Sequence, residues 1–212
     1  MTAQPVETQR SEPVAARMPA VVRPGAITLT RHGQPELSRR CWLTSEGYRN
    51  WWARYEVLGL RAGQTPPAAL LETARGAGAI IASIRPRAIE SANAISQGRE
   101  VIIDALFVEA PLPPPKLPDW FKLSPRWWGV LSRMTWHMGH GVEGHETRAE
   151  AEARAAEAAR ALIARAEAGQ DILVLAHGYF NHMVGRQLKA NGWRLVRNQG
   201  FKYWSQRRFE RE

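Results

Sequence analysis

Two histidines in this chain lie at the ends of short runs of apolar or β-branched residues. His32 lies in GAITLTRHGQ, between Arg31 and Gly33, and His177 lies in DILVLAHGYF, directly before Gly178. Two imidazoles beside an arginine can bind a metal ion, form a base–nucleophile pair, or hold a phosphoryl group. The types of these residues therefore indicate a small polar site, built where two strands end.

The arginine beside His32 favours the phosphoryl group among these ligands. A guanidinium opposes a dication, whereas its planar fork matches two phosphate oxygens and stabilises the charge of a phosphoryl-transfer transition state. Gly33 lets the backbone approach a ligand closely. A neutral imidazole can itself attack phosphorus, which gives a phosphohistidine and splits one difficult step into two. We expect no metal ion and no organic cofactor in such a site.

The segments around the two histidines predict how they come together. Apolar runs over residues 26–30, 79–83 and 172–175 are typical of buried strands, and helical patterns over 44–58, 65–76, 87–98, 147–168 and about 180–191 alternate with them. This alternation favours an α/β fold with three layers, α/β/α, around a mostly parallel sheet. Ligands bind beyond the carboxyl ends of such strands, so we expect His32 and His177 to meet there.

Capping signals predict where several helices begin. Thr44 and Thr65 are expected N-caps, with Pro66 at the first position of the second helix. Thr147 and Glu150 have the spacing of a capping box. The C-terminal segment predicts two short strands around residues 198–200.

The composition is that of a globular protein with one domain. The chain has 212 residues, of which 44% are hydrophobic, enough to bury a sizeable core. Residues 1–24 lack hydrophobic periodicity and are expected to form a flexible leader before a domain over 25–212. The chain shows neither a secretory signal nor the roughly twenty apolar residues of a membrane span, so we expect a cytoplasmic protein without membrane contact. The sequence does not indicate an oligomeric state.

The net charge of +9 suits anionic partners. Phosphorylated small molecules are one such class, and nucleic acid is a less favoured alternative. The alternative rests on a basic C-terminal segment in which aromatic residues alternate with cations: Trp193, Arg194, Arg197, Phe201, Lys202, Tyr203, Trp204, Arg207, Arg208 and Arg211.

Five ordered segments resemble one known family. They are LTRHGQ (29–34), LTSEG (43–47), SIRPRAIESA (83–92), DALFVEAP (104–111) and LVLAHG (173–178). Together they are similar to the signature segments of the histidine phosphatase superfamily, whose members include phosphoglycerate mutase-like phosphatases. A lone Arg-His-Gly would be weak evidence, but the order and approximate spacing of all five agree across residues 26–180.

The resemblance implies a phosphoglycerate mutase-like fold and a metal-independent phosphatase. Its substrates would be phosphate monoesters of small molecules, its intermediate a phosphohistidine on His32, and its product inorganic phosphate. The resemblance assigns catalytic roles to His32, Glu109 and His177, and phosphate-binding roles to Arg31, Arg87, His177 and Gln34. Glu109 would protonate the leaving group, with Asp104, Glu143 and Glu146 as competitors for that role. The nearby arginines should lower the pKa of His32 by like-charge repulsion.

Some segments depart from the pattern of the family. Gln-Pro-Glu follows Arg-His-Gly where mutases carry a further polar segment, Ala176 stands before His177 where serine is common, and APLPPPKLP (110–118) replaces a glycine-rich stretch. The first and third departures favour a phosphatase over a phosphomutase. A phosphomutase and a member that binds phosphorylated ligands without turnover are the alternatives.

An insertion over about residues 110–146 is rich in Pro, Trp and Gly, and the sequence pattern does not predict its conformation. Its aromatic and basic residues fit either a lid over an aromatic or sugar-like phosphate ester or a small satellite core: Trp120, Trp127, Trp128, Trp136, Lys116, Lys122, Arg126 and Arg133. A metal cluster of His137, His140, His145, Glu143 and Glu146 lacks a recognised zinc spacing. We therefore favour a polar loop near the mouth of the site.

Overall fold

A computed structural model describes residues 22–139 and 145–211. The central sheet has six strands in the order β3-β2-β4-β1-β6-β5. These are β1 (Ile27–Arg31), β2 (Ala79–Ser83), β3 (Ile102–Asp104), β4 (Ile172–Ala176), β5 (Arg194–Asn198) and β6 (Gln206–Glu210). The first four run parallel, and β6 and β5 add an antiparallel edge. The predicted α/β class with a mostly parallel sheet is confirmed.

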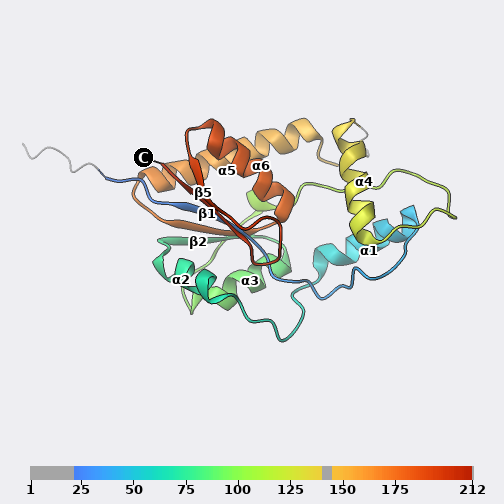
Figure 1. Ribbon diagram of the computed structural model, residues 1–212, viewed down its shortest axis with the longest axis horizontal. Helices are drawn as coiled ribbons and strands as arrows, with labels where there is room; N and C mark the ends of the chain where they lie inside the picture. Colours follow the sequence, from blue (N-terminus) through green and yellow to red (C-terminus); the bar gives the residue numbers. More distant parts are fainter. Residues whose placement is uncertain (1–21, 140–144, 212) are drawn as a thin grey trace, which may run out of the picture.

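Helices cover both faces of the sheet (Figure 1). One layer consists of α2 (Ala68–Gly76) and α3 (Pro86–Ser96), and the other of α5 (Arg148–Glu167) and α6 (Gly178–Ala190). Side chains of β4 alternate between the two cores, because Leu173 packs with α2 and α3 whereas Val174 packs with α5 and α6. Burial on both faces explains why β2 and β4 are almost continuously apolar.

Two helices form a separate aromatic layer beyond the sheet. Figure 1 shows α1 (Ser45–Val57) and α4 (Pro125–His137) side by side, to the right of the sheet. Tyr48, Trp51 and Tyr55 of α1 pack with Trp128 of α4 in a buried cluster. A short 3-10 helix, η1 (Ala105–Phe107), follows β3. Within the described ranges, no helix is long and apolar enough to cross a membrane.

The helix caps confirm two predictions and correct a third. Thr44 accepts a hydrogen bond from the backbone of Gly47, and Thr147 forms both bonds of the capping box. Thr65 and Pro66, however, do not begin α2, which starts at Ala68 with Pro67 as N-cap. The reason is steric, because Pro67 disfavours helical geometry at the residue before it.

The helix expected from about residue 180 begins earlier, at Gly178, with His177 as its N-cap. The helical turn thus follows the second histidine at once. This places the amino terminus of α6 at the carboxyl end of β4, next to the end of β1.

Candidate active site

The two histidines lie side by side at the carboxyl edge of the sheet. In the parallel pair of β1 and β4, Arg31 lies opposite Ala176, so His32 and His177 follow equivalent strand ends. The two ring centroids are 5.2 Å apart in an edge-on arrangement, and both side chains are buried, with 2% and 1% of their surfaces exposed. The register of two adjacent strands therefore brings together residues that are remote in sequence.

The ring of His32 is fixed by its own backbone. Nδ1 lies 2.6 Å from the carbonyl oxygen of Gly33, which can only accept, so Nδ1 donates and Nε2 keeps its lone pair. Gly33 is held in turn by the hydroxyl of Ser91, which accepts from its backbone N–H at 2.8 Å. A Cβ at position 33 would lie 2.4 Å from the ring of Trp204, which explains the glycine by close packing. The site thus presents His32 in one orientation, with Nε2 able to act as a base or nucleophile.

His177 is held by a serine and an arginine. Its Nε2 lies 2.9 Å from the hydroxyl of Ser83, at the end of β2, and its Nδ1 lies 3.5 Å from Nη2 of Arg87. A phosphate oxygen that reaches His177 must replace one of these contacts, and the longer contact to Arg87 is the weaker. Ser83 is the first residue of the family-like segment SIRPRAIESA, but the sequence did not indicate that its hydroxyl contacts His177.

Arg31 and Arg87 each present a buried donor at this edge. Arg31 donates to the carbonyl of Phe201 and stacks 4.4 Å from the ring of Tyr203. Among the described residues, its Nε has no hydrogen-bond partner, and neither does Nε of Arg87. Two buried guanidinium donors without partners are suited to an anion, because leaving them unpaired is costly.

Arg87 is fully buried and is fixed by α1. Its Nη1 donates to the carbonyl of Tyr55 at 2.6 Å, and its Nη2 pairs with the carboxylate of Glu56 at 3.0 Å. The same carboxylate also pairs with Arg85. The guanidinium is therefore pre-positioned from the helix that forms one wall of the site.

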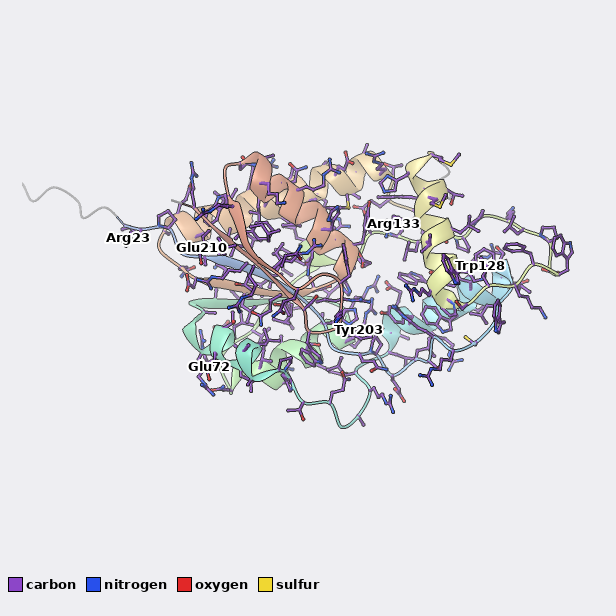
Figure 2. The ribbon with its side chains drawn as sticks, in the orientation of Figure 1. Arg23, Glu72, Trp128, Arg133, Tyr203 and Glu210 are labelled. Atoms are coloured by element: carbon purple, nitrogen blue, oxygen red, sulfur yellow. The ribbon has the colours of Figure 1, made fainter. Side chains whose placement is uncertain are left out.

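A cavity of about 750 Å³ contains five of the six predicted site residues. They are Arg31, His32, Arg87, Glu109 and His177. Arg39 and Arg133 also line it: Arg39 donates to the hydroxyl of Tyr55 at 3.0 Å, and Arg133 donates to the carbonyl of Ala110 at 3.3 Å. Figure 2 shows Arg133 extending from α4 toward the sheet. The cavity is thus strongly basic.

The prediction for Gln34 does not fit this geometry. Gln34 is exposed and does not line the cavity. Its backbone N–H donates to the side chain of Gln64 at 2.7 Å, and its carbonyl accepts from the backbone of Arg61. The chain therefore turns away from the histidines directly after Gly33, toward the loop before α2.

Glu109 is the one carboxylate among the described residues that line the cavity. Its Oε1 accepts from the backbone of Phe180 at 2.8 Å and of Ala110 at 3.1 Å, and its Oε2 accepts from Tyr179 at 3.3 Å. The carboxylate thus accepts from backbone N–H groups at the amino terminus of α6, which have no partner within the helix.

Two of the competing acids serve other parts of the fold. Asp104 caps η1 by accepting from the backbone of Leu106, and Glu146 pairs with Arg154 at 2.7 Å. Glu143 lies outside the described residues. These contacts leave Glu109 as the candidate acid.

Burial and nearby cations keep both histidines neutral. Burial is the largest cause of the lowered pKa of His32, and the charges of Arg31 and Arg87 lower it further. The pKa of His177 is lowered by burial first, and then by Arg87 and His32. The direction expected from the arginines is confirmed, but desolvation outweighs charge repulsion.

This lowered pKa predicts a pH-dependent stability. In the unfolded chain the histidines protonate near the ordinary value of 6.5, whereas in the folded protein they protonate well below it. Between these values the unfolded chain binds more protons, so the free energy of unfolding should fall as the pH drops below 6.5, by up to about 1.4 kcal/mol per pH unit for each histidine. Urea unfolding of wild type and His177→Asn across this range measures the slope. Equal slopes would show that His177 titrates normally.

Of the three histidines of the insertion, His137 lies against a tyrosine of α6. Nε2 of His137 contacts the hydroxyl of Tyr179 at 2.6 Å, and residues 140–144 lie outside the described ranges. In residues 22–139 and 145–211, no three histidine, cysteine or acidic side chains are grouped so that they could hold a metal ion.

Two of the four tryptophans of the insertion are buried, and the other two are exposed outside the cavity. Trp128 and Trp136 are buried, and Trp128 packs against Tyr48 of α1, whereas Trp120 and Trp127 are exposed. Figure 2 shows Trp128 at the end of α4 nearest α1. The satellite core is therefore present, and neither exposed tryptophan lines the cavity.

The aromatic residues of the C-terminal segment mostly serve the fold. Trp193 and Trp204 are buried, and Phe201 lines the cavity. Arg208 and Arg211 pair with Glu210 and Glu167. Arg194, Arg197, Phe201 and Lys202 are exposed, so the segment keeps three cations and one aromatic ring at the surface.

Comparisons with known proteins agree with this architecture. The family model of the histidine phosphatase superfamily (branch 1) matches residues 27–210. The solved structure of mycobacterial hydrolase 1 superposes with a TM-score of 0.56 at 18% identity, over 88% of this chain and 89% of that one. A mycobacterial glucosyl-3-phosphoglycerate phosphatase in complex with VO3 gives 0.53 at 18% identity, over 87% and 92%. At these identities the likeness concerns the fold. A search of curated protein sequences gave no match.

Proposed function

The chain belongs to the histidine phosphatase superfamily (branch 1), a family of phosphoric monoester hydrolases, and from this premise we propose that it hydrolyses phosphate monoesters of small molecules through a phosphohistidine on His32. One observation carries the proposal. His32 and His177 lie edge to edge in a cavity that Arg31 and Arg87 also line, and the Nε donors of both arginines have no partner among the described residues. Such an arrangement suits a tetrahedral dianion.

The first step transfers the phosphoryl group to the enzyme. Arg31, Arg87 and His177 bind the non-bridging oxygens, and Nε2 of His32 attacks phosphorus in line. The Nε2–P bond forms as the ester P–O bond breaks. Glu109 gives its proton to the leaving oxygen, so the alcohol departs neutral. The proton is best placed on Oε2 of Glu109. Oε2 accepts one hydrogen bond, which is longer than either of the two that Oε1 accepts.

The second step releases inorganic phosphate. The Glu109 carboxylate takes a proton from water, whose oxygen attacks phosphorus as the Nε2–P bond breaks. Glu109 ends protonated and His32 ends neutral, so one molecule of ester and one of water give alcohol and phosphate. The lowered pKa of His32 favours the neutral nucleophile before each turnover.

The position of Glu109 favours a phosphatase over a protein that binds phosphorylated ligands without hydrolysing them. A member that only binds phosphorylated ligands needs no proton donor beside the anion, yet Glu109 lines the same cavity as both histidines. Analysis of the reaction products distinguishes a phosphatase from a phosphomutase. A phosphatase releases inorganic phosphate, whereas a mutase would yield an isomeric ester and little inorganic phosphate.

Turnover of p-nitrophenyl phosphate in excess EDTA tests the proposal. The guanidinium groups supply the positive charge, so the rate should not change with the chelator. Acid-labile, alkali-stable phosphoenzyme should accumulate in quenched samples, because a phosphoramidate bond has that stability. Loss of activity in EDTA that Mg²⁺ or Zn²⁺ restores would show a metal-dependent reaction instead.

Arg87→Ala should weaken the inhibition by inorganic phosphate. Loss of a buried, charge-assisted contact raises the inhibition constant by about 10- to 100-fold. Arg85→Ala is the matched control, because Arg85 pairs with the same Glu56 but does not line the catalytic cavity. Steady-state inhibition of p-nitrophenyl phosphate turnover measures both. A similar rise in the two variants would trace the effect to Glu56 rather than to contact with phosphate.

A further inference from the structure

The side chains that line the catalytic cavity indicate which kind of alcohol the substrate ester contains. Resting on the proposed function, we infer that this enzyme acts on phosphate esters whose alcohol carries a large apolar group. The group is held between Trp52 of α1 and an apolar stripe on α4. The stripe consists of Val130, Met134 and Met138.

The stripe follows from the geometry of α4. Its residues are four positions apart, so they lie on one face of the helix and its carboxyl-terminal end. Val130 is 44% exposed, Met134 58% and Met138 71%, and all three line the cavity that contains His32. Large apolar side chains gathered on a concave surface commonly mark a binding site.

The opposite helix offers a rigid aromatic surface. Trp52 is half-buried, lines the cavity, and stacks on Tyr55 with ring centroids 5.2 Å apart. Trp51, its neighbour, donates its indole N–H to the carbonyl of Ser38 and stacks on Tyr48. Because this cluster is fixed by packing and a hydrogen bond, Trp52 can contact a ligand with little loss of side-chain entropy.

The polar side chains near the stripe are largely engaged by the protein. The guanidinium of Arg133 lies 3.7 Å from the ring of Tyr179 and 4.7 Å from that of Trp136. Nε2 of His137 contacts the hydroxyl of Tyr179. One Arg133 donor, Nη1, has no partner among the described residues and suits an oxygen of the phosphate ester. Arg126, one turn before Val130, is exposed and also lines the cavity, so the apolar part of this wall is limited to residues 130–138.

The position of the phosphate site shows which part of the substrate lies against the apolar walls. The catalytic groups and both apolar walls line one cavity of about 750 Å³, within the usual range for small-molecule sites of roughly 300–1,000 Å³. A phosphate held at His32 leaves its alcohol part in the remaining space. Methionine side chains are flexible, so the stripe can adapt to a ring or to an alkyl chain.

Octyl phosphate and glycerol 1-phosphate give the first test. Both release primary alcohols, so they differ mainly in the apolar surface of the leaving group. We expect KM for octyl phosphate to be at least about 100-fold lower, because each buried methylene contributes about 0.8 kcal/mol. Phenyl and 1-naphthyl phosphate form a second arm that tests aromatic groups. Equal KM values within both arms would overturn the inference, and a preference in one arm alone identifies the apolar group as chain or ring.

Variants of the stripe give the second test. Val130→Thr with Met134→Gln keeps the shape but adds polar atoms, and should raise KM for the preferred apolar ester about tenfold with kcat unchanged. KM for glycerol 1-phosphate should stay the same. Trp127→Gln is the control, because Trp127 is exposed on the same helix but does not line the cavity. An unchanged KM for the apolar ester in the double variant would overturn the inference.

Binding to His32→Ala separates this inference from the proposed function. Calorimetry with octyl phosphate and glycerol 1-phosphate measures affinity without turnover. If wild type hydrolyses none of the esters, the proposed function fails, while tighter binding of octyl phosphate still supports the apolar site. If wild type hydrolyses all of them and binding shows no preference, only the apolar site fails.

Discussion

Replacing His32 by alanine should lower kcat for p-nitrophenyl phosphate by about 10⁴- to 10⁶-fold, as loss of a nucleophile does in other covalent enzymes. The expected size follows from the role proposed for Nε2. The backbone carbonyl of Gly33 holds Nδ1, so Nε2 alone is left to attack phosphorus. The neighbouring His177 cannot replace it, because Ser83 and Arg87 contact both of its nitrogens.

Three measurements separate this chemical effect from unfolding. His32 is buried, so a melting curve and phosphate binding should show that the variant keeps its fold, and His32→Asn gives a second substitution that fills the space. His182→Ala is a matched control, because His182 contacts Arg207 and does not line the cavity. No phosphoenzyme should be trapped in either His32 variant. Activity within tenfold of wild type in a folded His32 variant would remove the phosphohistidine from the mechanism.

Local sequence signals predicted the elements that carry the site. Each histidine lies just after a short run rich in apolar or β-branched residues, and the length and composition of such a run favour a strand. The carboxyl ends of adjacent parallel strands meet at one edge, so the meeting of His32 and His177 follows from topology. Thr147 and Glu150 predicted the start of α5 because a capping box involves only neighbouring residues.

Contacts that depend on tertiary folding had no such signal. Arg39 reaches the cavity from a loop without periodicity, and its partner Tyr55 comes from the next helix. Glu56, which holds Arg87, is one of many acidic residues on helices. Gln34 illustrates the opposite case, because its place beside Gly33 suggested a phosphate contact, whereas its side chain is exposed and does not line the cavity.

The start of α4 could have been found in the sequence. Ser124 precedes Pro125, which is the usual order of an N-cap and a first helical residue. The tryptophans and glycines around it obscured this signal, because their helix propensity is modest or low. What the sequence did not contain was the packing of Trp128 on Tyr48, which sets α4 opposite Trp52 and closes the cavity.

Glu109→Gln should slow esters of poor leaving groups far more than esters of good ones. For octyl or glycerol phosphate, kcat should fall by about 10²- to 10⁴-fold, because the departing alkoxide needs a proton. p-Nitrophenolate leaves without one, so its first step should be little affected. Loss of the base slows the second step, so this substrate should show a burst of p-nitrophenolate before a slower steady rate.

The geometry around Glu109 determines the controls. A glutamine oxygen can still accept from Phe180 and Ala110, but its NH₂ group then faces the N–H of Tyr179, so α6 loses one capping contact. Glu146→Gln is the matched variant, because it breaks the ion pair with Arg154 outside the cavity. Rapid-quench kinetics with both classes of ester distinguish the possibilities. Because a structural loss would slow both classes of ester equally and give no burst, only a leaving-group-dependent loss supports Glu109 as the acid.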